Sequence, residues 1–223
     1  MTIPNAIAID GPVACGKTAV GRELAQRLDM RFLDTGVMYR AITLVALYRG
    51  LDIGDEQKLS ALAESVHMAL VPRESEDRLF VDGVDVTERL RDAAVERNVS
   101  HVAALARVRA ALVERQREIA HGGPIVMVGR DIGTVVLKDA GFKAFLRASV
   151  DVRAERRHKE IIAKGLSADL EQVKADLARR DKLDTERANS PLRAAEDAVT
   201  IDTDNLGLEE VIEKLMSLIE SSR

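Results

Sequence analysis

Cysteine, long apolar runs and an excess of positive charge are all missing from this chain of 223 residues. The one cysteine, Cys15, excludes an intramolecular disulfide and a cysteine-cluster metal site. No apolar run approaches the roughly 20 residues that span a bilayer, and no charged leader precedes the first apolar segment. The 4 histidines have no metal-ligand spacing. We therefore expect a cytoplasmic protein with no membrane partner.

The charge balance argues against nucleic acid as a partner. The 37 acidic residues outnumber the 33 basic ones, giving a net charge of −4, and 46% hydrophobic content favours a globular chain over a disordered one. The basic residues nevertheless gather in two clusters, at residues 147–159 and 179–193. Each cluster is consistent with a solvated helix face, but in a protein that holds a triphosphate it becomes a candidate phosphate clamp.

What the chain does contain is the phosphate-loop pattern G-x-x-x-x-G-K-[ST], at residues 11–18. A short apolar strand precedes it, and Val20, Leu24 and Leu28 follow at helical spacing, which argues against an ordinary glycine-rich turn. Such a loop directs backbone N–H groups at a β-phosphate, helped by the positive end of the helix dipole. Lys17 would then reach the β- and γ-phosphates, and Thr18 would offer its hydroxyl to Mg²⁺.

Strand and helix patterns alternate along most of the chain. Strands are expected at residues 3–10, 31–34, 125–128, 142–146 and 198–201. The expected helices include one that carries Met38, Ile42, Val45 and Leu47, a long one with Leu105, Val108, Leu112 and Ile119 on one face, a basic helix to about residue 165, a charged helix to about residue 183, and a final helix with Val211, Leu215 and Leu218. This alternation predicts an α/β fold, with a parallel sheet flanked by helices on both faces.

Residues from about 55 to 92 depart from this alternation. Residues 67–72 and 78–81 are typical of short strands, and Asp82-Gly83 is a strong hairpin-turn pair. We interpret the segment as a small inserted subdomain.

Three polar segments directly follow predicted strands, at residues 10–11, 34–35 and 130–131. In a parallel sheet such segments meet at the carboxyl ends of the strands, where ligands bind. Charges that end a buried strand are costly unless paired, which favours a functional role for Arg130 and Asp131. Thr35, Tyr39 and Arg40 lie where a second ligand would face the triphosphate, although they are also consistent with a helix start packing on the sheet.

Five segments together resemble one family. They are residues 9–18, 34–40, 100–103 with 107–109, 129–136 (GRDIGTVV), and 180–187. From Ile9 to about Ile219 the chain resembles the bacterial cytidylate kinases, which belong to the nucleoside monophosphate kinases. The resemblance implies a single P-loop kinase domain with its core at about 1–40, 93–151 and 167–223. It also implies a monophosphate-binding insert at about 41–92 and a helical lid at about 152–166.

The resemblance also implies roles for individual residues. The ATP-binding residues would be Gly11, Pro12, Val13, Ala14, Cys15, Gly16, Lys17, Thr18, Ala19, Arg156 and Arg157, the last two belonging with Arg153 to the lid. CMP would be bound by Thr35, Tyr39, Arg40, Ser100, Arg109, Arg130, Asp131, Arg180, Asp184 and Arg187. Within that set, Arg40, Arg130 and Arg187 match phosphate contacts, Ser100, Arg109 and Asp131 match cytosine contacts, and Arg180 and Asp184 match ribose contacts. The catalytic residues would be Lys17, Arg130, Arg157 and Arg187. Two departures are minor, since Thr35 replaces a frequent serine but keeps the hydroxyl, and Cys15 occupies a position often filled by a small residue.

The expected activity is transfer of the γ-phosphoryl group of Mg·ATP to CMP, and to dCMP, by a monomer. The acceptor phosphate is nearly a dianion at neutral pH, its second pKa being about 6, so the reaction needs positive charge more than a strong base. A shikimate-type kinase is one alternative, in which Asp34 would serve as base, but Gly36 stands where a second acid would be useful. A nucleotide switch or ATPase motor is the other. Neither a strand-terminal acidic run nor a GTPase-type base-reading strand supports it, because residues 181–184 follow a helix and begin with Asp.

Overall fold

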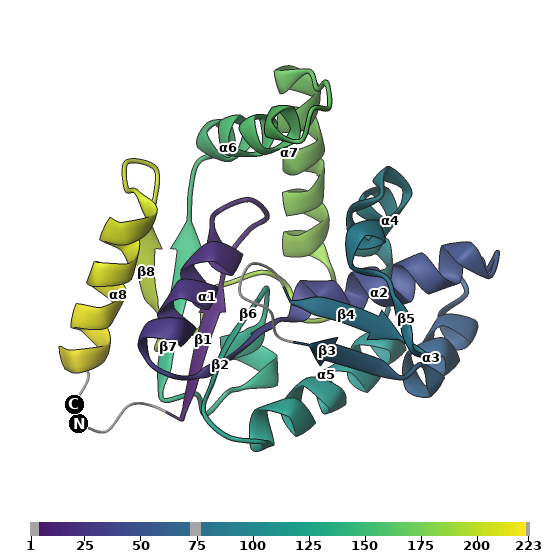
Figure 1. Ribbon diagram of the computed structural model, residues 1–223, viewed down its shortest axis with the longest axis horizontal. Coiled ribbons are helices and arrows are strands. Elements are labelled where there is room, and N and C mark those ends of the chain that lie inside the picture. The colour runs from purple at the N-terminus through teal and green to yellow at the C-terminus, as the bar shows by residue number, and fades with distance from the viewer. Residues whose placement is uncertain (1–4, 72–76, 222–223) are drawn as a thin grey trace. The chain divides into compact units, whose positions relative to one another are not determined.

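The computed structural model describes residues 5–71 and 77–221. Its chain packs as two compact units, a larger one formed by residues 1–34 and 120–223 and a smaller one formed by residues 35–119. In Figure 1 the smaller unit runs from blue to teal, and the larger unit comprises the purple start of the chain and the part that runs from teal through green to yellow. The predicted boundaries of a monophosphate-binding insert and a lid concern function, and they remain predictions.

A five-stranded parallel sheet forms the centre of the larger unit (Figure 1). Its strands, in spatial order, are β2 (Arg31–Asp34), β6 (Ile125–Gly129), β1 (Ala6–Asp10), β7 (Phe142–Arg147) and β8 (Val199–Asp202). The strands β1 and β6 are almost wholly buried, which explains their continuous apolar sequence. The α/β class and the five sheet strands expected from the sequence are confirmed, with Ile3 and Pro4 of the first one outside the described residues.

Helices cover this sheet with apolar faces. The helices α1 (Lys17–Arg27) and α8 (Leu208–Ser221) pack on each other and share one core with the strands, built around Val20, Leu24, Val211 and Leu215. The helices α6 (Val150–Ala163) and α7 (Leu170–Glu186) pack together as a pair. A short π-helical turn, η2 (Ile132–Val136), follows β6 and contacts β1. Such turns are frequent at functional sites.

The strand register brings the three polar strand ends together. Asp10 is paired with Gly129 across β1 and β6, and Asp34 is paired with Val128 across β2 and β6. Arg130 follows Gly129 directly. The carboxyl ends of three neighbouring strands therefore carry Asp10, Asp34 and Arg130 at one edge, as the sequence predicted.

The smaller unit contains helices and a small antiparallel sheet. Its elements are α2 (Thr35–Tyr48), α3 (Glu56–Ser65), β3 (Met68–Val71), β4 (Arg78–Val81), β5 (Val84–Asp85), η1 (Thr87–Arg91), α4 (Ala93–Ala104) and α5 (Ala106–His121), the last of which runs into the larger unit. Asp82 and Gly83 form the two-residue turn between β4 and β5 with positive φ angles of 49° and 82°, so the predicted hairpin turn is confirmed. The prediction missed α3, which begins where the Asp55 carboxylate accepts the Lys58 N–H.

The long helix expected to carry Leu105, Val108, Leu112 and Ile119 is present as α5, but it begins after Leu105, where the chain breaks from a separate helix, α4. Leu105 has an extended conformation, with φ −69° and ψ 119°, and a Glu56 side-chain oxygen accepts the Arg107 N–H in the first turn of α5. Val108 and Leu112 are buried as expected, whereas Ile119 is 37% exposed. A side chain 51 residues away in the sequence therefore caps the start of α5, at a break that periodicity alone did not indicate.

Candidate active site

The phosphate loop joins β1 to α1, as its sequence predicts. A Cβ atom on Gly11 would lie 2.2 Å from the carbonyl oxygen of Leu146, so only glycine fits against β7 there. Gly16 precedes α1 with φ 93°, in the left-handed region that favours glycine. Both glycines of the motif are thus required by the backbone, one by close approach and one by conformation.

Lys17 lies folded back over this loop. Its side chain is buried, and its ammonium donates to the Pro12 carbonyl at 2.5 Å and to the Cys15 sulfur at 3.6 Å. The pKa of Lys17 is lowered from 10.5 to about 8, chiefly by burial and also by Arg130, while Cys15 and Asp34 act in the opposite direction. The positive charge of this buried ammonium is poorly compensated by its surroundings, so the site is well suited to an anionic ligand.

Thr18 and Asp34 form the oxygen-rich part of the site. The Thr18 hydroxyl donates to an Asp34 carboxylate oxygen at 2.7 Å, and Thr18 is exposed. Hydroxyl and carboxylate oxygens are the ligands that Mg²⁺ prefers, usually alongside water and substrate phosphates. Residues 5–71 and 77–221 contain no cluster of three or more His, Cys, Asp or Glu that would hold a metal by itself. The pair therefore fits a metal ion that is carried largely by a nucleotide.

Asp10 connects the loop to the turn that follows Arg130. It is 3% exposed, and its two carboxylate oxygens accept the N–H groups of Ile132 and Gly133, each at 2.8 Å. Burial raises the pKa of Asp10 to about 6, partly opposed by those two hydrogen bonds. The sequence placed Asp10 at a strand end but assigned it no role. Its contacts hold the backbone that presents Arg130 and Asp131.

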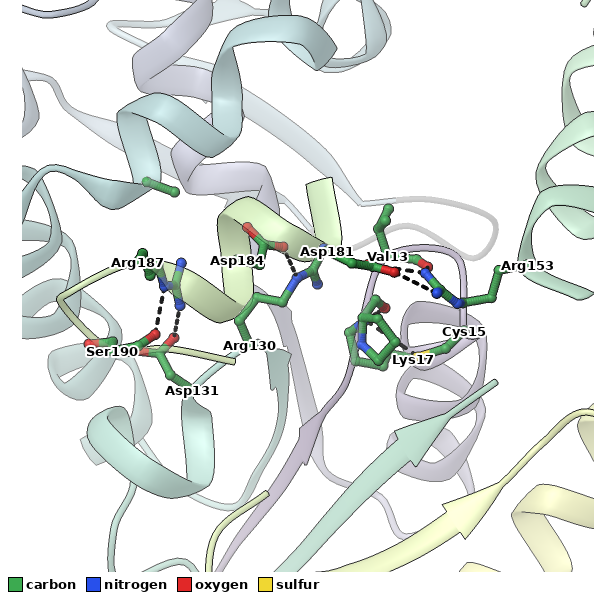
Figure 2. A network of polar contacts seen from close by, with 12 residues as sticks. Val13, Cys15, Lys17, Arg130, Asp131, Arg153, Asp181, Asp184, Arg187 and Ser190 are labelled. Atoms are coloured by element: carbon green, nitrogen blue, oxygen red, sulfur yellow. Dashed lines mark hydrogen bonds and ion pairs between the residues drawn. The ribbon is translucent and has the colours of Figure 1, made fainter. Parts of the chain in front are cut away.

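Four of the residues predicted to bind substrate form two pairs beside the loop (Figure 2). Arg130 donates through Nε to Asp184 at 2.8 Å, and Arg187 lies 3.7 Å from Asp131 while donating to the Ser190 carbonyl at 2.6 Å. Burial alone would raise the pKa of Asp184, but Arg130, Arg187 and Arg180 together hold it below its usual value. The larger unit thus brings together residues predicted to contact the phosphate, the ribose and the cytosine of the acceptor.

The arginines of α6 differ from one another. Arg156 donates to the hydroxyl and carbonyl oxygens of Thr203, and Arg157 pairs with Glu160 on its own helix at 2.9 Å. Arg153 is buried and donates to the carbonyl of Val13 in the phosphate loop and to Asp181 on α7. The sequence predicted no role for Asp181. The phosphate contacts expected of Arg156 and Arg157 remain predictions.

The smaller unit carries the other predicted acceptor residues. The Arg109 guanidinium lies 5.3 Å from the centroid of the Tyr39 ring and donates to the Ala103 carbonyl. Arg40 on α2 pairs with Glu96 on α4 at 3.0 Å, a contact that the sequence did not predict. Thr35, in the first turn of α2, and Ser100, on α4, are buried, as are Tyr39 and Arg109. Tyr39 and Arg109 are therefore brought together, and Arg40 is held by a carboxylate with no predicted substrate contact.

Comparisons with known proteins agree with this geometry. The family model described as cytidylate kinase matches residues 7–221. A curated cytidylate kinase of Geobacillus kaustophilus is 50% identical over 213 residues, covering 96% of this chain and 95% of the relative. One of Leuconostoc mesenteroides is 45% identical over 216 residues, covering 97% and 96%. A crystal structure of an uncharacterized protein from Eubacterium ventriosum shares the fold, with a TM-score of 0.52 at 13% identity and coverage of 97% and 98%. Over the described residues, no helix has the length and apolar character needed to cross a membrane.

Proposed function

This chain belongs to the cytidylate kinase family, and from that premise we propose that it transfers the γ-phosphoryl group of Mg·ATP to CMP, and to dCMP. The observation that carries the proposal is the clustering of Lys17, Arg130 and Arg187 with the carboxylates of Asp131 and Asp184 in one unit. Positive charge supplied by a lysine and several arginines is what phosphoryl transfer requires. Carboxylates suit the hydroxyls and amino group of a cytidine.

The donor would bind at the phosphate loop. Backbone N–H groups of residues 11–19 would surround the β-phosphate, and Lys17 would exchange its contact with the Pro12 carbonyl for phosphate oxygens. An anion in this position compensates the buried ammonium and returns its pKa towards the usual value. Arg156 and Arg157 would approach the same phosphates from α6 as a lid that excludes water.

Mg²⁺ would be held by Thr18, within reach of Asp34, together with the phosphates of the donor. When bound, the ion would neutralise charge on the phosphoryl oxygens of the donor. The Thr18 hydroxyl would supply one ligand oxygen, and Asp34 orients that hydroxyl by accepting a hydrogen bond from it.

The acceptor would be held by groups that now pair with each other. Its phosphate would bind to Arg130 and Arg187, with Arg40 as a third arginine, and the ribose hydroxyls would donate to Asp184. Arrival of the phosphate would therefore replace the contact of Arg130 with Asp184, leaving that carboxylate to the sugar. Arg180 would assist at the ribose.

The base would be recognised by Ser100, Arg109 and Asp131. This mixture of donors and acceptors matches the O2, N3 and amino edge of cytosine. In UMP a carbonyl replaces the amino group, so Asp131 would face an acceptor and lose a hydrogen bond. No strong general base is required, because the attacking phosphate is already close to a dianion. A monomeric state and a cytoplasmic location also belong to this proposal.

A substrate panel tests the proposal. The purified protein is offered CMP, dCMP, UMP, AMP or shikimate with Mg·ATP, and ADP release is measured. We expect CMP and dCMP to give the highest kcat/KM values, by at least about tenfold over UMP and AMP. Faster turnover of UMP or AMP would contradict the base-reading role of Asp131, and turnover of shikimate alone would contradict the proposed function.

A further inference from the structure

Arg153 joins three segments of the larger unit (Figure 2). It lies in the first turn of α6 with a side chain 5% exposed, and its Nε donates to the Ala148 carbonyl at 3.0 Å. One terminal nitrogen donates to the Val13 carbonyl at 3.2 Å and to Asp181 at 3.1 Å, and the other donates to Asp181 at 2.5 Å. One guanidinium therefore links the start of α6, the phosphate loop and α7.

The position of Asp181 on α7 gives this contact its significance. Asp181 lies next to Arg180 and three residues before Asp184, the two predicted ribose contacts. Asp184 in turn pairs with Arg130. The helix α7 therefore connects Arg153, which lies on the side of the phosphate donor, with the groups proposed to bind the acceptor.

The chemistry of the pair makes it a stiff link. The planar guanidinium matches a carboxylate in two parallel hydrogen bonds, and only 24% of the Asp181 side chain is exposed. Separating a mostly buried pair leaves charges poorly solvated, which is strongly unfavourable. The phosphate loop and α7 are thus held in one relative position, and fixing the loop backbone fixes the helix.

We propose that the Arg153–Asp181 pair couples the binding of the two nucleotides by holding α7 against the phosphate loop. In this proposal Arg153 and Asp181 are positioning residues, since they act through the Val13 carbonyl and α7. The inference rests on the proposed function, because it assumes that the loop binds ATP and that α7 binds CMP. Coupling between two sites is reciprocal, so ATP would tighten CMP binding and CMP would tighten ATP binding by the same factor.

The test measures the Kd of CMP by calorimetry, alone and with saturating Mg²⁺ and the β,γ-imido analogue of ATP. For the wild type we expect the analogue to lower the Kd about 5- to 20-fold. In Asp181→Asn the factor should fall below about 2, while the Kd of CMP alone stays within about twofold of wild type. The KM for CMP at saturating ATP should rise by the lost factor, with kcat changing much less.

Asp151→Asn is the matched control. Asp151 pairs with Lys174, so this change also breaks a contact between α6 and α7, but an exposed one that does not reach the loop. It should keep the wild-type coupling factor. A second variant, Arg153→Lys, keeps the charge yet cannot reach Asp181, Val13 and Ala148 together, and it should lose coupling too.

The outcomes separate the two proposals. Failure of the wild type to phosphorylate CMP overturns the proposed function. If CMP is phosphorylated but the wild-type factor is 1, or Asp181→Asn keeps the wild-type factor, only the coupling inference is overturned. Loss of folding in both Asp181→Asn and Arg153→Lys, judged by circular dichroism, would assign the pair to stability and overturn the inference as well.

Discussion

The arginines of the larger and smaller units are held in different ways. In the larger unit Arg130 pairs with Asp184, a carboxylate that is itself proposed to bind the ribose. In the smaller unit Arg40 pairs with Glu96, which has no proposed contact with a substrate. When CMP binds, Arg130 and Asp184 would separate and each would contact the substrate. Arg40 would instead leave Glu96, which has no proposed role in binding. Removing a carboxylate should harm catalysis in the larger unit far more than in the smaller one.

The largest effect is expected at the centre of the larger unit, for Lys17→Met. Loss of the only lysine proposed to contact the β- and γ-phosphates should lower kcat by about 10³-fold or more. The same change should raise the free energy of unfolding of the ligand-free protein at pH 7 by about 1–3 kcal/mol, because it removes a buried ammonium whose pKa is lowered to about 8. Steady-state kinetics and urea unfolding measure the two effects.

The sign of the Lys17 effect can be checked against pH. Between about pH 8 and pH 10.5 the unfolded chain keeps a proton that the folded protein has lost, so this group makes wild-type stability rise with pH across that window. That rise should be smaller in Lys17→Met. A variant that is less stable than wild type at pH 7 would show that Lys17 is well compensated without a nucleotide.

The next largest effect is expected for Arg130→Ala. Its kcat/KM for CMP should fall by about 10²- to 10³-fold, because the guanidinium is proposed to neutralise the acceptor phosphate in the transition state. Arg147→Ala is the control, since Arg147 ends β7, another strand of the same sheet, but is 61% exposed and pairs with Asp202 at the surface. It should stay within about twofold of wild type. Equal effects of the two changes would remove Arg130 from the mechanism.

The comparison between the units is tested most sharply by two carboxylate variants. Asp184→Asn should raise the KM for CMP by about 10- to 100-fold, because it removes one of the two oxygens proposed to accept from the ribose and the negative charge that holds Arg130. Glu96→Gln should change that KM by no more than about threefold, because Glu96 has no proposed contact with CMP and the introduced amide oxygen can still accept a hydrogen bond from Arg40. Similar losses in both variants, measured with CMP as the varied substrate, would contradict the distinction between the units.

The smallest effect concerns Asp10 and stability. Asp10→Asn should lower the free energy of unfolding by about 1–3 kcal/mol at pH 4, since an amide can accept only one of the two N–H groups that the carboxyl group now faces. In the wild type the folded protein keeps the Asp10 proton up to about pH 6, whereas the unfolded chain loses it near pH 3.8. This group therefore makes stability fall as pH rises from about 4 to 6. Asp10→Asn should flatten that slope, and an unchanged slope would rule out Asp10 as its source.

Local patterns were enough to predict much of the fold. The phosphate loop and its flanking elements follow from a short motif, and the sheet strands follow from nearly continuous apolar segments. The carboxyl-end rule for parallel strands then predicted that Asp10, Asp34 and Arg130 would lie at neighbouring strand ends. These features depend on residues close in sequence or on general rules of topology.

The remaining features depend on contacts between distant residues. Apolar spacing runs unbroken through Leu105, Val108 and Leu112, and no glycine or proline marks the break that separates α4 from α5. The pairing of Arg153 with Asp181 and of Arg40 with Glu96 joins residues 28 and 56 positions apart. A sequence lists such charged groups without saying which of them meet, so the partners of the arginines could be seen only in the structure.

The exchange of partners at Arg130 is the central claim, and a crystal structure with CMP and the β,γ-imido analogue of ATP tests it most directly. The account predicts that the guanidinium nitrogens of Arg130 and Arg187 lie about 2.7–2.9 Å from oxygens of the CMP phosphate. It also predicts that Asp184 has left Arg130 and accepts hydrogen bonds from the ribose hydroxyls. A complex in which Arg130 still pairs with Asp184 at 2.8 Å, and the CMP phosphate is bound by other groups, would contradict it.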